Sequence, residues 1–176
     1  RVIKEGGVLV WVVSDATING SETLSSFSQV IHFKKIGFNV HDTMIWDKGA
    51  FTATGSLKVR YGSVFEYMFI LSKGKPKTFN PIKDKKNLHV GKKFSTSRVK
   101  TKDGNTRPRS NKDKPTAEFG QRYNIWRINT AKPYKNHPAV FPEQLANDHI
   151  ISWSNEGDLV YDPFIGSGTT AKMCIL

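Results

Sequence analysis

The stretch "DLVYDPFIGSGTTAKM", residues 158–173, decides how this chain folds. Its first half predicts a short strand, because residues 159–161 form an apolar run that follows the turn-like "SNEG". Its second half predicts the start of a helix, "TTAKM". Between them, Gly166 and Gly168 allow backbone conformations that other residues avoid, and they leave main-chain N–H groups open to a ligand. The stretch therefore predicts a strand, a ligand-binding turn and a helix.

Three kinds of ligand-binding turn have this general form, and their spacing separates them. A P-loop is excluded, because it requires Lys followed by Ser or Thr after its second glycine, whereas two threonines follow Gly168. The dinucleotide-binding pattern G-x-G-x-x-G/A is matched by Gly166, Gly168 and Ala171, but the acid that it expects about 20 residues later would lie beyond Leu176. The nucleoside-binding turn of S-adenosylmethionine-dependent methyltransferases stays open, as does a glycine turn that only connects strand to helix.

Length and composition indicate one soluble domain with an insertion. The 176 residues suffice for a domain with its own core. The single cysteine, Cys174, excludes an intrachain disulfide and is predicted to be buried, which fits a reducing cytoplasm. No apolar run approaches the roughly 20 residues of a membrane span, so we expect no membrane partner. Five histidines and one cysteine offer no metal-ligand spacing, so no metal is expected.

The net charge of +12 is concentrated in one tract. Residues 73–114 contain fifteen Lys or Arg against three acids, whereas the rest of the chain is balanced. Such a tract is typical of proteins that bind a polyanion, and each neutralised phosphate adds salt-dependent affinity. The alternative is a solvated, disordered loop. We favour nucleic acid, because the balanced remainder needs no such loop for solubility.

The first half of the chain has the order typical of an α/β fold. Residues 8–13 form an apolar run that predicts a parallel strand buried on both faces. A helix with one apolar face is predicted next, with Ser21 as its N-cap and Gly37 just past its end. Residues 38–46 and 64–71 predict two more strands, which could be antiparallel neighbours at one sheet edge. Strand, helix and strand together indicate an α/β fold.

An insertion and a second helix follow. Apolar residues become rare between 73 and 120, which predicts a loop or insertion rather than core. Further on, Pro142 suits a first helical turn, and the residues that follow it form one apolar face: Leu145, His149, Ile150 and Trp153. We therefore interpret His149 as a packed histidine rather than a ligand. Trp46 ends an apolar strand and is likewise predicted to pack in the core rather than stack on a base.

Two motifs together resemble a known family. The segments "DPFIGSGTT" (162–170) and "NHPAVFPEQL" (136–145) are similar to the cofactor motifs of DNA amino-methyltransferases, which methylate adenine N6 or cytosine N4. The resemblance implies S-adenosylmethionine as cofactor and double-stranded DNA as partner, within restriction-modification. It also implies an α/β, Rossmann-like methyltransferase fold, with a mostly parallel sheet and an antiparallel edge.

The order of parts resembles the permuted class in which target recognition precedes the cofactor motif. Residues 1–72 then correspond to the catalytic half, 73–120 to a basic target-recognition insertion and 121–176 to the cofactor-binding segment. In this class the insertion should track the DNA backbone, and we expect it to be loosely ordered without DNA. The cations assigned to DNA are Lys83, Lys85, Lys86, Lys92, Lys93, Arg98, Arg107 and Arg109.

The resemblance implies cofactor-binding roles for those residues of this chain that match the family motifs. The turn should line the cofactor, with the dipole of the following helix facing its carboxylate. A second wall should come from the "HPAVFP" segment. The cofactor residues implied are Asp162, Phe164, Gly166, Gly168 and Thr169, with His137, Pro138, Phe141 and Pro142 opposite them.

One departure from the family is large. The catalytic tetrapeptide Asp/Ser/Asn-Pro-Pro-Tyr/Phe/Trp is absent from the 176 residues and would lie before Arg1 in this class. Both ends also fall inside predicted helices. We therefore expect a fragment, incomplete at both ends and inactive alone, with the missing N-terminal part or a homodimer partner completing it. A non-catalytic DNA-binding protein derived from a methyltransferase is the main alternative, and an RNA methyltransferase is the third.

Overall fold

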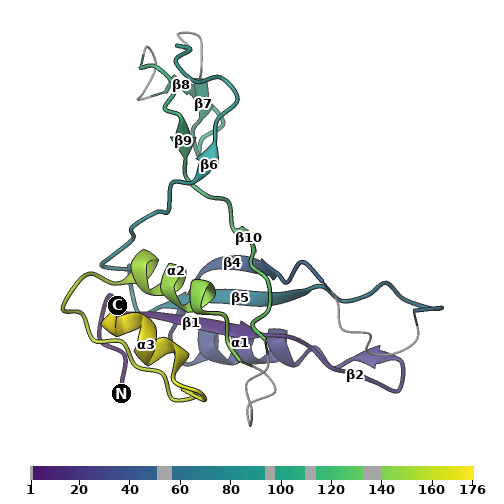
Figure 1. Cartoon of the computed structure of the whole chain (residues 1–176). Helices are drawn as coiled ribbons and strands as arrows, with labels where there is room; N and C mark the ends of the chain where they lie inside the picture. Colours follow the sequence, from purple (N-terminus) through teal and green to yellow (C-terminus); the bar gives the residue numbers. More distant parts are fainter. Residues whose placement is uncertain (1, 51–56, 94–97, 110–113, 133–139) are drawn as a thin grey trace. The chain divides into compact units, whose positions relative to one another are not determined.

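The computed structural model describes residues 2–50, 57–93, 98–109, 114–132 and 140–176, and these form two compact units. Unit 1 combines Arg1–Asn80 with Asn124–Leu176, and unit 2 is Pro81–Tyr123 (Figure 1). Unit 2 overlaps most of the insertion expected at 73–120. It is a continuous stretch, so the chain leaves unit 1 once and returns to it once.

Unit 1 is built on a mixed four-stranded sheet. Its strands, in spatial order, are β1 (Val8–Val13), β5 (Phe65–Ser72), β4 (Asn39–Asp47) and β10 (Ile125–Arg127). The middle strand β5 runs antiparallel to both β1 and β4, and β10 is parallel to β4. The predicted α/β, Rossmann-like fold is confirmed, as is the antiparallel pairing of β4 with β5.

Two details of the sheet differ from the expectation. The strand β1 has no parallel neighbour among the described residues, and the antiparallel strand lies inside the sheet rather than at its edge. The cause is that β5 returns between β1 and β4 and hydrogen-bonds to both. A continuous apolar run reveals that a strand is covered on both faces, but it does not reveal the direction of the neighbouring strand.

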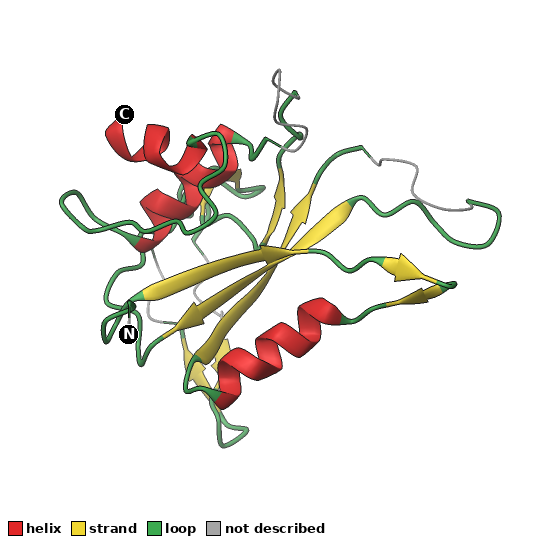
Figure 2. Ribbon diagram, turned by 90° about the horizontal axis from the view of Figure 1, so that it is seen from below, coloured by secondary structure: helices red, strands yellow, loops and turns green. Residues whose placement is uncertain are grey.

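The core lies on both faces of β5. Side chains alternate along a strand, so Tyr67 and Phe69 lie on one face, where both contact the Phe27 ring of α1 (Ser25–Lys35). On the other face, the Met68 sulfur lies 3.2 Å from His149 Nε2 of α2 (Glu143–Trp153). Helices therefore cover opposite faces of the sheet (Figure 2), with α3 (Thr169–Ile175) beside α2.

Helix α1 begins three residues later than predicted. Ser21, the expected N-cap, instead belongs to a small hairpin of β2 (Thr17–Ile18) and β3 (Ser21–Glu22). Leu24, in the left-handed region with φ of 52°, turns the chain into the helix. At the other end Gly37 has φ of +101°, so the predicted glycine stop is confirmed.

The acceptor that caps α1 comes from a distant residue, Asp15, directly after β1. Its carboxylate accepts hydrogen bonds from Ser26 N (3.0 Å), Ser25 Oγ (3.0 Å) and Thr23 Oγ1 (3.2 Å), and also from Ser26 Oγ. Burial raises the pKa of Asp15, but these hydrogen bonds outweigh burial and leave the pKa below its usual value. Asp15 thus joins the end of β1 to the start of α1.

The strand expected at residues 159–161 does not form. Leu159 is 92% exposed and Tyr161 65%, and neither pairs with any described strand. A strand needs a neighbouring strand to satisfy its backbone groups, and no described strand lies beside this apolar run. The helix predicted after the glycines is α3, as expected, but Cys174 within it is exposed rather than buried. Among the described residues no helix has the length and apolar character needed to cross a membrane.

Unit 2 has more order than the sequence predicts. It contains two antiparallel pairs, β6 (Lys85–Lys86) with β9 (Phe119–Gly120) and β7 (Arg98–Lys100) with β8 (Thr106–Pro108). Its two ends meet, because Arg122 N donates to Ile82 O at 2.9 Å.

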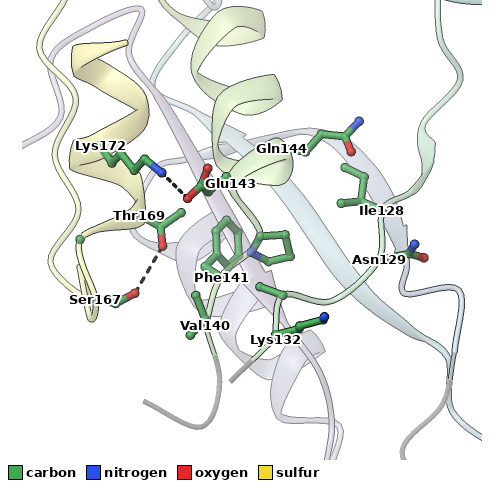
Figure 3. A pocket seen from close by; sticks show the side chains of 13 residues that line it. Ile128, Asn129, Lys132, Val140, Phe141, Glu143, Gln144, Ser167, Thr169 and Lys172 are labelled. Atoms are coloured by element: carbon green, nitrogen blue, oxygen red, sulfur yellow. Dashed lines mark hydrogen bonds and ion pairs between the residues drawn. The ribbon is translucent and has the colours of Figure 1, made fainter. Parts of the chain in front are cut away.

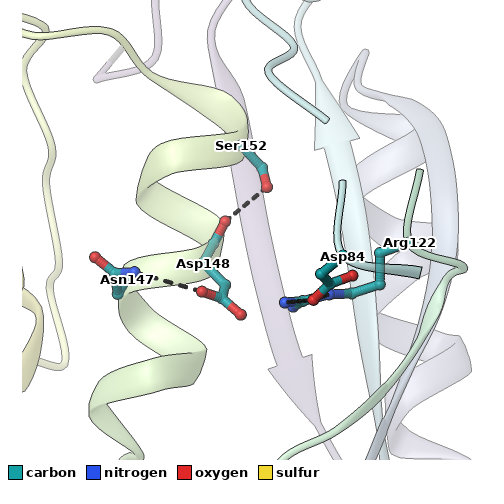
Figure 4. A network of polar contacts seen from close by, with 5 residues as sticks. All are labelled: Asp84, Arg122, Asn147, Asp148 and Ser152. Atoms are coloured by element: carbon teal, nitrogen blue, oxygen red, sulfur yellow. Dashed lines mark hydrogen bonds and ion pairs between the residues drawn. The ribbon is translucent and has the colours of Figure 1, made fainter. Parts of the chain in front are cut away.

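The Arg122 guanidinium strengthens this closure. It also donates two hydrogen bonds to the Asp84 carboxylate (Figure 4). These hydrogen bonds, the largest influence, outweigh partial burial and lower the pKa of Asp84. The acid therefore stays charged, and the ion pair holds the two ends of unit 2 together.

Asparagine side chains anchor unit 1 on both sides of the insertion. Asn80 Nδ2 donates to the carbonyls of Ile151 and Ser154, each at 3.1 Å, at the end of α2. Asn124 Nδ2 donates to Thr43 O of β4, also at 3.1 Å. Each anchor satisfies carbonyls in unit 1 and fixes the position at which the chain departs or returns.

His149 is a core histidine, as predicted. The side chain is buried, with the Trp126 ring centroid 4.6 Å from its own and no hydrogen-bond partner for Nδ1 in the described structure. Burial penalises the charged form and lowers the pKa of His149 to about 3. The imidazole is therefore neutral at physiological pH.

Acid should consequently destabilise unit 1 through His149. In the unfolded chain histidine has its ordinary pKa of about 6.5, so the unfolded state binds the extra proton first as the pH falls. The contribution of neutral His149 to the free energy of unfolding should be fully present above pH 6.5. Below that pH the free energy of unfolding should fall by about 1.4 kcal/mol per pH unit, which is a loss of about 2 kcal/mol at pH 5. Urea unfolding at pH 7, 6 and 5 measures this loss.

The variant His149→Phe cannot titrate at this position and should lose most of the slope between pH 6.5 and 5. As the matched control, His41→Gln removes an exposed histidine and should keep the slope. A slope that is the same in His149→Phe and the parent would show that another group is responsible.

Candidate functional site

A cavity of about 600 Å³ lies in unit 1, where four chain segments meet (Figure 3). The segments are residues 128–132 after β10, residues 140–144 at the start of α2, residues 167–169 of the glycine turn, and Lys172 one turn into α3. The volume is in the range of pockets that bind small molecules or cofactors, about 300–1,000 Å³. Two of these segments belong to the two motifs identified in the sequence.

Trp46 of β4 positions two walls of the cavity. Its side chain is 5% exposed, and its Nε1 donates to Ile128 O at 2.7 Å, which holds the segment that follows β10. The Phe141 ring lies edge-on to the Trp46 ring, with the centroids 6.1 Å apart. The prediction that Trp46 packs in the core is confirmed, and the same packing fixes Phe141 beside the cavity.

Proline fixes the start of α2 at the same wall. Pro142 is the N-cap residue, with φ of −63°, and is buried directly before Glu143. Because its ring restricts φ to about −65°, it pre-orders the entry into the helix. The "FP" of the second motif therefore forms a stiff wall.

The glycine turn is held by Asp162. One carboxylate oxygen accepts from Phe164 N at 2.9 Å, and the other accepts from Thr170 Oγ1 at 2.6 Å. Gly168 has φ of +88°, a conformation that residues with a Cβ rarely adopt, and its N–H donates to Ile165 O. A Cβ built on Gly168 meets no protein atom within 4 Å, so the space beside this glycine is open.

An ion pair joins the two helices at the cavity. Lys172 Nζ of α3 lies 2.6 Å from Glu143 Oε1 of α2, and both side chains are about half exposed. Surface pairs of this kind contribute little free energy, but this one links the glycine turn to the opposite wall. Lys132, also on the cavity, makes no hydrogen bond or ion pair within the described part of the chain.

The structure brings together four of the nine residues predicted to bind a cofactor. Phe141 and Pro142 line the cavity from one side, and Gly168 and Thr169 line it from the other. His137 and Pro138 lie outside the described residues. The remaining three belong to the turn but do not line the cavity: Asp162, Phe164 and Gly166.

Phe164 and several cavity residues have positions that sequence reasoning did not predict. Phe164 is 77% exposed and lies edge-on to Trp11 of β1, with the ring centroids 6.2 Å apart. The cavity residues not identified from the sequence include Asn129, Lys132, Gln144 and Lys172. Gln144 lies within the second motif but was given no role there. The other three lie outside both motifs and reach the cavity only through the fold, so no local signal marks them.

Most cations predicted to bind DNA are exposed in unit 2. Those without a side-chain hydrogen bond or ion pair among the described residues are Lys83, Lys86, Lys92, Lys93, Arg107 and Arg109. Two of the predicted set are engaged. Lys85 Nζ donates to Asn87 Oδ1 and Tyr123 Oη, each at 3.2 Å, and lies over the Tyr123 ring. Arg98 donates twice to Thr106.

No cluster of three or more metal-ligating side chains occurs in the parts of the chain that the structure describes.

The family model for DNA methylases, which covers N6 and N4 enzymes, matches residues 1–176. The chain belongs to this N6/N4 DNA methylase family. The resemblance inferred from the two motifs is thereby confirmed over the whole length of the chain.

Two curated relatives are similar to this chain. It is 54% identical over 184 residues to the orphan methyltransferase M.BamHII of Bacillus amyloliquefaciens, covering all of this chain and 68% of the relative. It is 32% identical over 190 residues to the type II methyltransferase M.MjaI of Methanocaldococcus jannaschii, covering 99% of this chain and 55% of the relative. The chain therefore spans between half and about two thirds of these relatives.

Solved structures of methyltransferases share the fold. The PvuII DNA methyltransferase, described as cytosine-N4-specific, has a TM-score of 0.66 at 19% identity, with 98% of this chain and 56% of that chain covered. The M1.HpyAVI–SAM complex has a TM-score of 0.60 at 22% identity, with 99% and 65% covered. These likenesses confirm the Rossmann-like methyltransferase fold.

Proposed function

We propose that the cavity binds S-adenosylmethionine and that the intact protein transfers its methyl group to adenine N6 or cytosine N4 of double-stranded DNA. The observation that carries the proposal is the meeting of two motifs at one cavity. Gly168 and Thr169 of the glycine turn face Phe141 and Pro142 of the second motif across about 600 Å³. Family membership and the two curated methyltransferase relatives support the same conclusion.

The residues present suit this cofactor. Open space beside Gly168 admits a ligand close to the backbone, and Asp162 keeps the turn in shape through Phe164 N and Thr170 Oγ1. Phe141 supplies an apolar surface, while the nearby polar side chains can meet a charged amino-acid group. The lining thus combines apolar walls with a few polar groups, as small-molecule sites generally do.

Methyl transfer from S-adenosylmethionine requires little of the protein besides positioning of the reacting groups. S-adenosylmethionine supplies an activated methyl group on a sulfonium sulfur, which is already a good leaving group. A target base must leave the duplex stack to reach an enclosed site. The residues around the cavity then hold the reacting groups in line and exclude water, and orientation of this kind can lower a barrier by roughly 7–11 kcal/mol.

We further propose that the free cations of unit 2 contact the DNA backbone. Unit 2 has thirteen Lys or Arg against four acids, and its free lysines can pair with phosphates as point charges. The compartment proposed for such an enzyme is the cytoplasm, which suits a chain with one cysteine. The catalytic Pro-Pro motif would come from the rest of the intact protein or from a homodimer partner.

Methyl transfer tests the proposal directly. The intact protein is incubated with S-adenosylmethionine carrying a labelled methyl group and with plasmid DNA, and the digested nucleosides are analysed by mass spectrometry. Labelled N6-methyladenine or N4-methylcytosine is the expected product. Binding of cofactor and DNA with no labelled nucleoside would instead support a non-catalytic DNA-binding protein, and label in RNA alone would contradict the proposed substrate.

A further inference from the structure

The β7–β8 hairpin of unit 2 has the charge and shape of a DNA-reading element. Residues 98–109 contain five cations and one acid, and all five cationic side chains are exposed. The strands pair antiparallel, with Arg98 opposite Pro108 and Lys100 opposite Thr106. A two-stranded ribbon of this kind fits the major groove of B-form DNA, which is about 12 Å wide.

The tip of this hairpin is held in one conformation. Gly104, with φ of +83°, donates to Thr101 O at 3.1 Å, and Thr101 N donates to Asn105 O at 2.7 Å. The Asp103 carboxylate accepts from Thr101 Oγ1 and from Asn105 Nδ2, the latter at 2.8 Å. The hydrogen bond from Thr101 is the largest cause of the lowered pKa of Asp103, so the acid remains charged. An ordered tip loses little conformational entropy when it binds.

The two faces of the hairpin differ. Paired residues of an antiparallel ladder share a face, so Arg98, Lys100, Thr106 and Pro108 lie on one side, and all four are exposed. Val99 and Arg107 lie on the other side, where Val99 is half-buried. The face of Arg98 is therefore the more open one.

Arg98 is the cation whose orientation the hairpin fixes. Its Nε donates to Thr106 Oγ1 and its Nη2 donates to Thr106 O, each at 2.9 Å. These two bonds use the side edge of the planar guanidinium. Among the described residues, nothing else bonds to this guanidinium, so its terminal edge keeps one N–H on Nη1 and one on Nη2. These two N–H groups are parallel and directed away from Thr106. That pair matches the O6 and N7 acceptors of guanine in the major groove.

We propose that the β7–β8 hairpin enters the major groove and that Arg98 reads a guanine of the target sequence, with Thr106 as its positioning residue. This inference rests on the proposed function of unit 2 in binding DNA. Unattached lysines can follow phosphates along any sequence, whereas a guanidinium held by two hydrogen bonds favours one acceptor geometry. The fixed arginine is therefore suited to discrimination and the free cations to affinity.

The test compares sequence preference with general affinity. The intact protein, Arg98→Ala, Arg98→Lys and Thr106→Val are each used to select from a pool of randomised DNA duplexes, and the bound fraction is sequenced. The parent should select a site with at least one fixed guanine. In Arg98→Ala, preference at one guanine should fall roughly tenfold or more, while affinity for an unselected duplex falls less than about threefold.

The other variants separate geometry from charge. Arg98→Lys keeps the charge but lacks the paired N–H groups, so it should lose the same guanine preference. Thr106→Val removes the side-chain acceptor and should weaken the preference, and Thr106→Ser should restore it. Lys100→Ala, on the same face, should instead weaken binding to all duplexes alike.

Two results would overturn the inference. One is an unchanged guanine preference in Arg98→Ala. The other is an equal loss of affinity for selected and unselected duplexes, which would make Arg98 a phosphate contact. A parent that binds no duplex at all would overturn the proposed function of unit 2, which is a different outcome from DNA binding without an Arg98-dependent preference.

Discussion

Gly168→Val is expected to weaken S-adenosylmethionine binding by roughly 100-fold, or about 2.7 kcal/mol. Gly168 lines the cavity, and a Cβ placed there meets only open space rather than protein. The branched side chain would therefore occupy volume that the ligand needs. Calorimetric titration of the intact parent and variant with S-adenosylmethionine measures the change.

The matched control for this substitution is Gly157→Val. Gly157 has φ of +81°, close to the +88° of Gly168, and a Cβ there also meets nothing within 4 Å, but it does not line the cavity. Both variants should lose similar stability from the unfavourable φ, about 1–2 kcal/mol. Only Gly168→Val should lose the cofactor, and a cofactor affinity within threefold of the parent would show that the glycine turn is not the binding site.

Neutralising four lysines of unit 2 is expected to lower DNA affinity on the order of 10³-fold at 0.1 M salt. The variant replaces by Gln the four exposed lysines without side-chain partners: Lys83, Lys86, Lys92 and Lys93. Lys85 is left in place, because its ammonium group is bound by Asn87 and Tyr123. If each lysine neutralises one phosphate, the slope of log affinity against log salt should decrease by about 3 to 4.

A salt titration of affinity for one duplex measures both quantities. The control carries four Lys→Gln changes in unit 1, at exposed positions without side-chain partners among the described residues: Lys4, Lys34, Lys35 and Lys75. It changes the net charge equally, so it separates local contacts from the overall field of the protein. Equal slopes for the unit 2 variant and the parent would leave the basic tract as a solvated loop.

Local chemistry explains what the sequence could predict about the site. A glycine turn can be predicted from the sequence because the φ of +88° at Gly168 is a property of one residue. Likewise, Pro142 and the apolar spacing around His149 predict the start and the buried face of α2 correctly. In each case the determining interaction lies within a few residues.

Features that depend on distant partners could not be predicted. Asp15 caps a helix eleven residues later in the chain, and Lys172 reaches Glu143 across 29 residues. Residues 159–161 look like a strand, but a strand also requires a neighbour, and no described strand pairs with them. The charge of the insertion was evident, whereas its two strand pairs depend on short polar segments with almost no apolar pattern.

The two ends of unit 2 are hydrogen-bonded to each other, so residues 81–123 can be exchanged as one segment. The chain enters unit 2 at Ile82 and leaves it at Arg122, and the backbones of these two residues are hydrogen-bonded. A segment that replaces unit 2 therefore has to bring its own two ends equally close together. Asn80 and Asn124 hold the junctions from the side of unit 1 and would stay in place. Genetic recombination at these junctions would exchange the unit that we propose to bind DNA and would leave the cavity residues of unit 1 unchanged.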